Sequence, residues 1–174
     1  HGTSTGRAGM TYPAQFTRMT GIQLLSLGCS GNCKMQSYFA DALVDADVDA
    51  FIFDSFSNPT PEQIKERLFP FIEKLQAAHP GKPLIFQHTI YREKRNFDQS
   101  VDKAEQAKMD MADSLMHIAC KKYKDVYYID CTNATDPVHD SSIDGVHPGN
   151  NGYTRWAESV KKPIVKILKK YGIQ

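Results

Sequence analysis

The sequence predicts an α/β protein: a three-layer α/β/α sandwich with a parallel sheet. Short apolar runs alternate along the chain with longer segments whose apolar residues recur at helical spacing, which is typical of strands alternating with amphipathic helices. The short runs are apolar throughout, as in strands that are covered on both faces. No repeat or low-complexity linker divides the 174 residues, which are enough for one domain with a full core.

The first elements can be placed in order along the chain. Residues 22–27 form an apolar run that ends at Gly28, which predicts a buried strand. A short helix is expected over 34–44. A second strand is expected from Val48 to Asp54, where a polar loop begins.

The next helix begins at Thr60. Thr60 and Gln63 fit a capping box, and Pro61 suits the first helical position. Pro70 lies inside this helix and predicts a kink. A third strand is expected over 83–88, after a helix whose buried positions are Ile64, Leu68, Phe71, Ile72 and Leu75.

The second half continues the alternation. We expect a long helix over 98–123, beginning at Asp98 or Ser100, then a strand over 126–130 and a final helix capped by Asn150 or Asn151. The spacing predicts buried positions at Val101, Ala104, Met111, Leu115 and Ile118 in the long helix, and at Tyr153, Trp156, Val160, Ile164 and Leu168 in the last one.

The loops that follow the strands are the expected location of a functional site. In a parallel sheet, ligands bind beyond the carboxyl ends of the strands. These loops cover residues 28–33, 55–58, 88–96 and 131–147. All four are therefore expected to open on one rim of the sheet.

Composition argues against several classes of function. Twenty-one basic and 20 acidic residues leave a net charge of +1, so no nucleic acid or other polyanion partner is indicated. No apolar run reaches the roughly 18 residues that a membrane span needs. No signal peptide is visible, and because the sequence opens at His1, an upstream segment is expected to have been removed.

The four cysteines do not define a compartment. Cys29 and Cys33 are close enough to bond to each other or to remain free thiols, and Cys120 and Cys131 flank the passage from the long helix to the strand that follows. No Cys-x-x-Cys pair with matching histidine spacing exists, so a zinc site is not expected.

The strongest candidate for chemistry is Asp144-Gly145-Val146-His147-Pro148. A short glycine-containing turn can hold the Asp144 carboxylate against one nitrogen of His147, which leaves the other nitrogen to take a proton from a nucleophile. His147 would then act as general base and general acid, while Asp144 fixes its tautomer. The alternative is that His147 fills a loop or caps a helix, and that Asp144 only forms a turn.

Two other loops offer donors for an oxyanion. In Gly28-Cys29-Ser30-Gly31-Asn32, the backbone N–H of Gly31 can point into a site because no side chain blocks the approach. The glycines could instead satisfy a tight turn. The Asn58 amide could donate to the same oxyanion, or Asn58 could form a turn before Pro59.

The remaining histidines carry weaker signals. His79 precedes Pro-Gly at a helix end and is expected to be exposed, and His117 is expected on the polar side of its helix. His88 ends a strand on the rim and could line a pocket there, and His139 would flank the site. A solvated face that complements the helix C-terminus is expected from Lys161, Lys162, Lys166, Lys169 and Lys170.

These motifs, in their order along the chain, resemble the SGNH (GDSL-like) hydrolases. The 144–148 segment, followed by Gly152-Tyr153, looks like the last block of the family. The 27–32 segment is similar to the second block, whose final glycine supplies an oxyanion N–H, here Gly31. The 54–58 segment resembles the third block, whose asparagine is Asn58. The resemblance implies a flavodoxin-like sandwich with esterase, lipase or carbohydrate deacetylase activity. It also implies that no metal or other cofactor is needed, and it favours a secreted or extracytoplasmic location.

The first block of the family is where this sequence departs. The family nucleophile is a serine in a Gly-x-Ser context at the end of the first strand, and Gly2-Thr3-Ser4 has those letters without a preceding strand. The segment 7–13 matches residues that follow the nucleophile in similar family members, and counting back places the nucleophile before His1. We therefore expect the nucleophile and a central first strand upstream, with Ser4 as the alternative. A further segment, another chain or a rearranged N-terminus would then replace that strand.

The sequence thus predicts a serine ester hydrolase. An activated serine attacks an acyl carbonyl, His147 moves the proton, Asp144 orients His147, and Gly31 and Asn58 stabilise the oxyanion. The expected substrate is a small-molecule or glycan ester with a short acyl group. One alternative is a catalytically inactive carbohydrate-binding module of the same fold. Another is a phosphate-binding protein that uses the 28–32 loop, although the glycine spacing around Lys34 does not match a P-loop.

Overall fold

The computed structural model describes residues 2–131, 134–135, 138 and 140–174, and it confirms the predicted α/β/α class. A three-stranded parallel sheet lies at the centre, in the order β1-β2-β3. The strands are β1 (Phe51–Phe53), β2 (Leu84–Gln87) and β3 (Val126–Ile129). In its register, Phe51 lies opposite Leu84, which lies opposite Val126.

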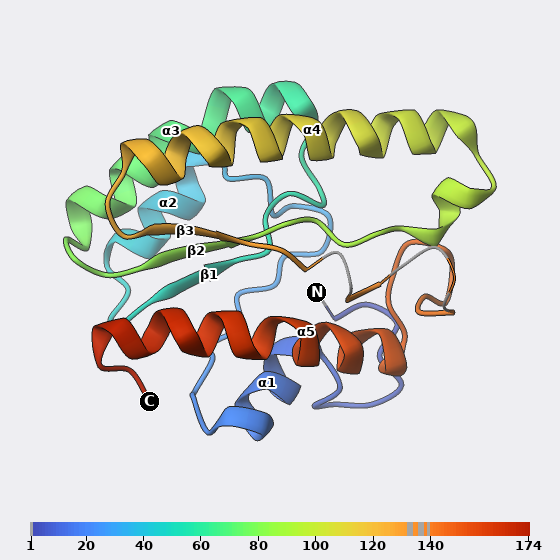
Figure 1. Ribbon diagram of the computed structural model, residues 1–174, viewed down its shortest axis with the longest axis horizontal. Helices are drawn as coiled ribbons and strands as arrows, with labels where there is room; N and C mark the ends of the chain where they lie inside the picture. The colour runs from blue at the N-terminus through green and yellow to red at the C-terminus, as the bar shows by residue number, and fades with distance from the viewer. Residues whose placement is uncertain (1, 132–133, 136–137, 139) are drawn as a thin grey trace.

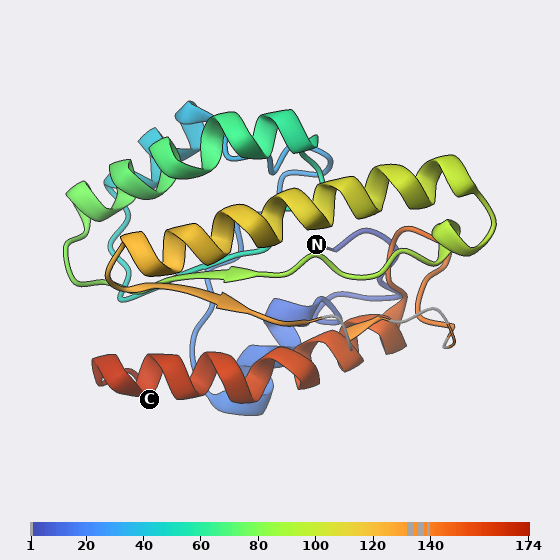
Figure 2. The ribbon, with the colours of Figure 1, turned by 45° about the horizontal axis from the view of Figure 1, so that its top comes forward.

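Helices cover both faces of this sheet (Figures 1 and 2). One face carries α2 (Ser37–Val44), α3 (Pro61–Ala78) and α4 (Gln99–Lys122). The other carries α1 (Tyr12–Thr20) and α5 (Asn150–Leu168). Two short 3-10 helices complete the described elements: η1 (Glu93–Asn96), just before α4, and η3 (Lys169–Tyr171), at the end of α5.

The alternation of side chains along each strand divides the interior into two cores. Phe53 and Phe86 pack with α2, α3 and α4, whereas Ile85 and Ile129 pack with α1 and α5. All four side chains are buried. Each contributes roughly 1.5–3 kcal/mol from burial, and the need to cover both faces explains why the strands are apolar throughout.

The predicted start of α3 is confirmed by its hydrogen bonds. Thr60 Oγ1 accepts from Gln63 N at 3.3 Å, and Gln63 Oε1 accepts from Thr60 N at 3.1 Å, which is the reciprocal pattern of a capping box. The α-helix then continues through Pro70 to Ala78.

The buried stripe of α5 is also as predicted, since all five positions are buried. Trp156 in this stripe donates from Nε1 to Gln87 Oε1 at 2.9 Å, and Gln87 donates from Nε2 to the Tyr12 hydroxyl at 3.1 Å. The Tyr12 and Trp156 rings stack with centroids 4.3 Å apart. A buried polar side chain of β2 therefore ties α1 and α5 to the sheet.

The predicted cap of α5 is wrong by one residue. Gly149 is the N-cap and Asn150 is the first helical residue. The Asn150 side chain is engaged elsewhere, because its Oδ1 accepts from Gly6 N at 2.7 Å.

The prediction of a strand over 22–27 is wrong. These residues form no strand, and Leu25 and Leu27 are 76% and 60% exposed. A strand needs a partner for its hydrogen bonds, and residues 22–27 pair with no strand, since the sheet of the described residues consists of β1, β2 and β3. Leu24 N donates to Thr17 Oγ1 of α1 at 3.3 Å instead.

The predicted buried face of α4 is only partly right, since Met111 and Leu115 pack against the core as partly buried residues. Asp98 caps this helix as expected, but Ala104 and Ile118 are exposed. The buried positions are Glu105, Lys108, Ala112, Met116 and Ala119. Two of these are charged, so the apolar pattern of the sequence marks only part of the face that packs against the sheet.

His79 is buried, contrary to the prediction. It is 7% exposed, its Nε2 lies 2.8 Å from Leu43 O, and the centroid of its ring lies 4.9 Å from that of Phe51.

All four cysteines are free thiols. No helix in the described ranges combines the length and apolar character required to cross a membrane.

Candidate active site

Asp144 and His147 form a direct pair at the loop before α5. His147 Nδ1 lies 2.7 Å from Asp144 Oδ2. The other oxygen, Oδ1, accepts from the backbone N–H groups of Val146 at 2.9 Å and of His147 at 2.7 Å. The turn therefore holds the carboxylate and the imidazole in one geometry, as the sequence predicts.

Hydrogen bonding sets the protonation of this pair. The bond to His147, followed by the two backbone N–H donors, holds the pKa of Asp144 well below its ordinary value. An ionised carboxylate only accepts hydrogen bonds, so Nδ1 of His147 carries the proton and Nε2 presents a lone pair. Nε2 bonds to none of the described residues, and the His147 side chain is 37% exposed. The imidazole can therefore take a proton from an incoming group.

Glu93 of η1 holds the loop that carries this pair. Its Oε1 accepts from Ser141 N at 2.6 Å, and its Oε2 accepts from Ser142 N at 3.2 Å and from the Ser142 hydroxyl. Lys94 N donates to Gly145 O at 2.8 Å on the far side of the same loop. Sequence patterns do not reveal this role, since Glu93 lies about 50 residues before its partners and in no recognisable motif.

Two glycines allow the loop to pack this closely. Gly145 has φ +81°, and a Cβ there would lie 3.1 Å from Lys94 N. A Cβ on Gly152 would lie 2.2 Å from Ser141 O, so no larger residue fits without movement of the backbone. The loop is therefore fixed from η1 on one side and from α5 on the other.

The rim loops contact one another in sequence order. Cys33 Sγ lies 3.4 Å from Ser55 Oγ, which joins the 28–33 loop to the 55–58 loop. Ser57 Oγ lies 3.0 Å from Thr89 Oγ1, which joins the 55–58 loop to the segment after β2. That segment continues into η1, which holds the Asp144–His147 loop.

The predicted oxyanion donors lie on two of these loops. Gly31 is exposed and has φ +70°, with open space around its Cβ position. Asn58 is partly buried and lies between Ser57 and Pro59. No described contact joins either residue directly to His147, so their role stays a prediction.

The N-terminal segment reaches the start of α5. Thr3 O accepts from the Tyr153 hydroxyl at 2.9 Å, and Gly6 N donates to Asn150 Oδ1. Ser4 lies between them and is partly buried, with φ +69°, an uncommon conformation for a residue other than glycine. Its segment thus lies against the helix turn that follows His147.

His88 lines a cavity of ≈ 390 Å³ at the edge of the sheet, as the sequence suggests. Its Nε2 lies 3.4 Å from Asp113 Oδ1, and the Tyr128 hydroxyl donates to the same oxygen at 2.6 Å. The exposed His117 lines this cavity too, whereas His139 lies outside the described residues. Neither Asp144 nor His147 lines this cavity.

No group of three or more His, Cys, Asp or Glu in the described part of the chain could hold a metal ion.

Asp54 is a further titratable group at the rim that the charge pattern alone does not mark. It follows β1 and opens the loop that leads to Asn58. Desolvation raises its pKa to about 6, against the opposing effect of Arg92. Carboxyl groups with raised pKa values are concentrated at functional sites.

The fold and the Asp–His pair define an α/β/α protein that carries an oriented imidazole in the loop before α5. The chain belongs to the GDSL-like Lipase/Acylhydrolase family, whose profile matches residues 1–166. Comparison of the sequence with functionally curated proteins finds no match.

Solved structures agree with this family. The chain is similar to a crystal structure of a "putative GDSL-like lipase" from Bacteroides ovatus ATCC 8483, with a TM-score of 0.90 and 36% identity over 97% of this chain and 50% of that one. It also resembles the salicylyl-acyltransferase SsfX3 from a tetracycline biosynthetic pathway, with a TM-score of 0.76 and 19% identity over 100% of this chain and 53% of that one. The chain therefore spans about half the length of these two proteins.

The fold is shared with a protein named as a carbohydrate esterase. A carbohydrate esterase family 3 structure from Talaromyces cellulolyticus has a TM-score of 0.68 and 14% identity, over 97% of this chain and 94% of that one. An acetyl esterase variant determined with acetate ion has a TM-score of 0.71 and 15% identity over the same shares of the two chains.

Proposed function

We propose that this chain is a serine ester hydrolase that acts on short acyl esters, including carbohydrate-linked ones. The observation that carries this proposal is the Asp144–His147 pair, in which an ionised carboxylate orients an imidazole whose Nε2 is available. Membership of the GDSL-like family supports the same chemistry.

The proposed reaction proceeds in two stages. His147 Nε2 takes the proton of the serine hydroxyl as its oxygen attacks the acyl carbonyl, and the imidazolium then gives that proton to the departing alkoxide. A water molecule attacks the acyl-enzyme in the same way, with His147 as base and then as acid, and releases the carboxylic acid. Asp144 stabilises the imidazolium in both stages. Gly31 N–H and the Asn58 amide are the proposed donors to the tetrahedral oxyanion.

For the nucleophile we keep both assignments that the sequence offers, a serine upstream of residue 1 and, as the alternative, Ser4. Three features support Ser4: its Gly-x-Ser context, its left-handed backbone, and the hydrogen bonds that join its neighbours Thr3 and Gly6 to the first turn of α5. Backbone strain of this kind is concentrated at functional sites.

An open, polar site supports a short acyl group. Asp144 and His147 are both well exposed, and neither of the two described cavities includes them. An apolar groove of ≈ 970 Å³ runs between α1 and the end of α5, where Met19, Ile22 and Val165 line it. Residues beside His147 do not contribute to that groove. The names of the two esterases that share the fold are consistent with acetyl and carbohydrate esters.

Hydrolysis of a short-chain aryl ester by the intact chain and by His147→Ala tests the proposal. Turnover that is lost in the variant supports the hydrolase. No turnover in either protein, together with saturable glycan binding, would refute the hydrolase and favour the catalytically inactive carbohydrate-binding module instead. A serine-directed phosphonate followed by peptide mapping then identifies the nucleophile, since labelling at Ser4 supports that assignment and absence of label in an active chain refutes it.

A further inference from the structure

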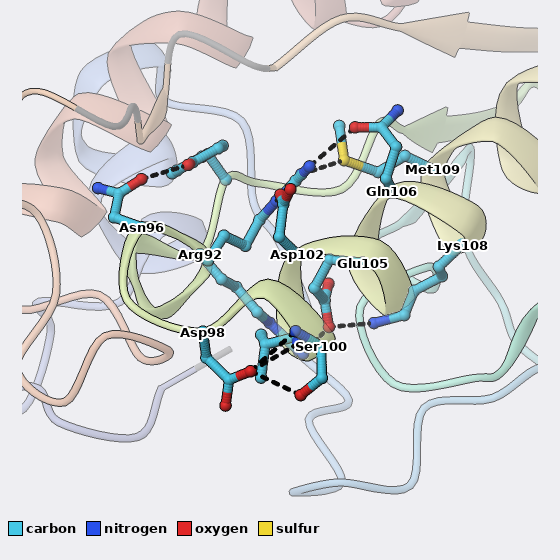
Figure 3. A network of polar contacts seen from close by, with 12 residues as sticks. Arg92, Asn96, Asp98, Ser100, Asp102, Glu105, Gln106, Lys108 and Met109 are labelled. Atoms are coloured by element: carbon cyan, nitrogen blue, oxygen red, sulfur yellow. Dashed lines mark hydrogen bonds and ion pairs between the residues drawn. The ribbon is translucent and has the colours of Figure 1, made fainter.

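Three charged side chains, Arg92, Glu105 and Lys108, form a cluster that is part of the polar network in Figure 3. Arg92 comes from the segment before η1, and Glu105 and Lys108 come from the first turns of α4. Glu105 Oε1 accepts from Arg92 Nη1 at 2.8 Å and from Lys108 Nζ at 2.7 Å. The three side chains are only 16%, 10% and 9% exposed.

Both cations of this cluster also donate to one backbone oxygen. Ser57 O accepts from Arg92 Nη2 at 2.8 Å and from Lys108 Nζ at 3.0 Å. The Ser57 side chain is held as well, by Thr89 at 3.0 Å. Two charge-assisted bonds on one carbonyl fix its direction more firmly than a neutral hydrogen bond can.

The peptide held in this way is the one that leads into Asn58. The carbonyl of Ser57 and the N–H of Asn58 belong to the same planar unit, so fixing the oxygen fixes the backbone from which the Asn58 side chain projects. On the other side, the ring of Pro59 restricts its own φ, and Thr60 is bonded into the cap of α3. Cations on the carbonyl also polarise the peptide, which strengthens the N–H as a donor.

Stability alone does not account for this arrangement. Burial of charges costs free energy that their attraction only offsets, so a buried ion pair adds little net stability. Burial lowers the pKa of Lys108, while Glu105 opposes that effect. Within the cluster one carboxylate serves two cations, and both cations also bond to Ser57 O.

We propose that Arg92 and Lys108 are positioning residues that hold Asn58 in place as an oxyanion donor. This inference rests on the proposed function, in which Asn58 contacts the tetrahedral intermediate. The two cations do not touch the substrate and act through the 57–58 peptide. Their removal should therefore lower kcat and leave KM nearly unchanged, since the donor matters most in the transition state.

Lys108→Met is the informative variant, because Glu105 keeps Arg92 as its partner and no buried charge is left alone. Lys122→Met is the matched control: it removes a lysine from the other end of α4, where Lys122 pairs with Glu73 at the surface. We expect about a tenfold loss of kcat for Lys108→Met, which is less than the roughly 10²-fold that a 1 Å misplacement of a catalytic group can cost, and no change for the control.

A double-mutant cycle with Asn58→Ala separates positioning from general damage. If Lys108 acts through Asn58, Lys108→Met costs little further activity once Asn58 is gone. An equal loss in both backgrounds would overturn the inference. If Asn58→Ala itself leaves turnover intact, the oxyanion assignment fails, which is a separate result.

NMR of the Asn58 amides tests the positioning without activity. In Lys108→Met, the Asn58 backbone N–H should shift upfield and its side-chain NH₂ should lose order on the ps–ns timescale, whereas Lys122→Met should change neither. Unchanged Asn58 signals in Lys108→Met would refute the positioning role even if the chain proves to be an esterase.

Discussion

Replacing Asp144 with asparagine should remove most of the esterase activity while leaving the loop intact. The asparagine oxygen can still accept from the backbone N–H groups of Val146 and His147, which Asp144 Oδ1 does now at 2.9 and 2.7 Å. Those two bonds direct the new NH₂ group at Nδ1 of His147. Because this group donates, Nδ1 must accept, and the ring proton moves to Nε2.

The size of the effect follows from that change of tautomer. Nε2–H cannot take a proton from the nucleophile, and the imidazolium loses the carboxylate 2.7 Å from Nδ1. The corresponding change in other triads lowers kcat by about 10⁴, so we expect a loss of about 10³–10⁴, equal to about 4–5.5 kcal/mol of transition-state stabilisation. The assay is hydrolysis of a short-chain aryl ester, with kcat and KM measured separately.

Asp140→Asn is the control for Asp144→Asn, since it removes a nearby exposed carboxylate that has no bond to His147 in the structure. It should leave kcat unchanged. A value of kcat for Asp144→Asn within about threefold of the wild type would refute the general-base mechanism.

The same variant has a defined signature in stability against pH. Because the folded pKa of Asp144 lies below its unfolded value, the carboxylate stabilises the fold above the unfolded pKa, and this contribution is lost as pH falls through the folded pKa. Asp144 is 51% exposed, so solvent reduces the effect to less than about 1 kcal/mol at pH 7. The difference in unfolding free energy between wild type and Asp144→Asn should therefore shrink below about pH 4.

Three further predictions concern the residues around the pair. Gly152→Ala should lower the unfolding free energy by about 2–4 kcal/mol in denaturant titrations, because the alanine Cβ would lie 2.2 Å from Ser141 O. A smaller loss would show that the loop around Ser141 can move aside. Glu93→Gln leaves the Ser142 N–H without its acceptor, so the unfolding free energy should fall by about 1–3 kcal/mol. The kcat should also fall with KM nearly unchanged, and an unchanged kcat would show that other contacts hold the loop. Burial raises the pKa of Asp54 from 3.8 to about 6, so the fold loses stability as pH rises between these values. Asp54→Asn should remove this part of the pH dependence in denaturant titrations, and an unchanged pH dependence would contradict the assignment.

Local patterns were sufficient to predict most of the fold. The capping box at Thr60, the apolar stripe of α5 and the short buried strands depend on residues that are near one another in sequence. The Asp144–His147 pair is of the same kind, since both partners come from one five-residue turn. Such features can be predicted because the chain needs no distant segment to form them.

Features that depend on distant partners could not be predicted. Residues 22–27 have the composition of a strand, but whether they form one depends on an edge supplied by another segment. Glu105 and Lys108 are charged and do not belong to the predicted apolar stripe of their helix, yet they are buried because Arg92 and Ser57 O satisfy them. Charged residues mark an exposed face only where no such partner exists.

The segment between β2 and α4 connects the two halves of the proposed site. Arg92 and Glu93 are adjacent in sequence and reach in different directions: Arg92 bonds to Ser57 O beside the proposed oxyanion donor, and Glu93 bonds to the loop that carries His147. A shift of this one segment would move the base and the oxyanion donor together. Variants of Arg92 and Glu93 should therefore show coupled losses of kcat. Gly31 lies on the loop that Cys33 joins to Ser55, with no described bond to Arg92 or Glu93, and its variants should behave independently of both.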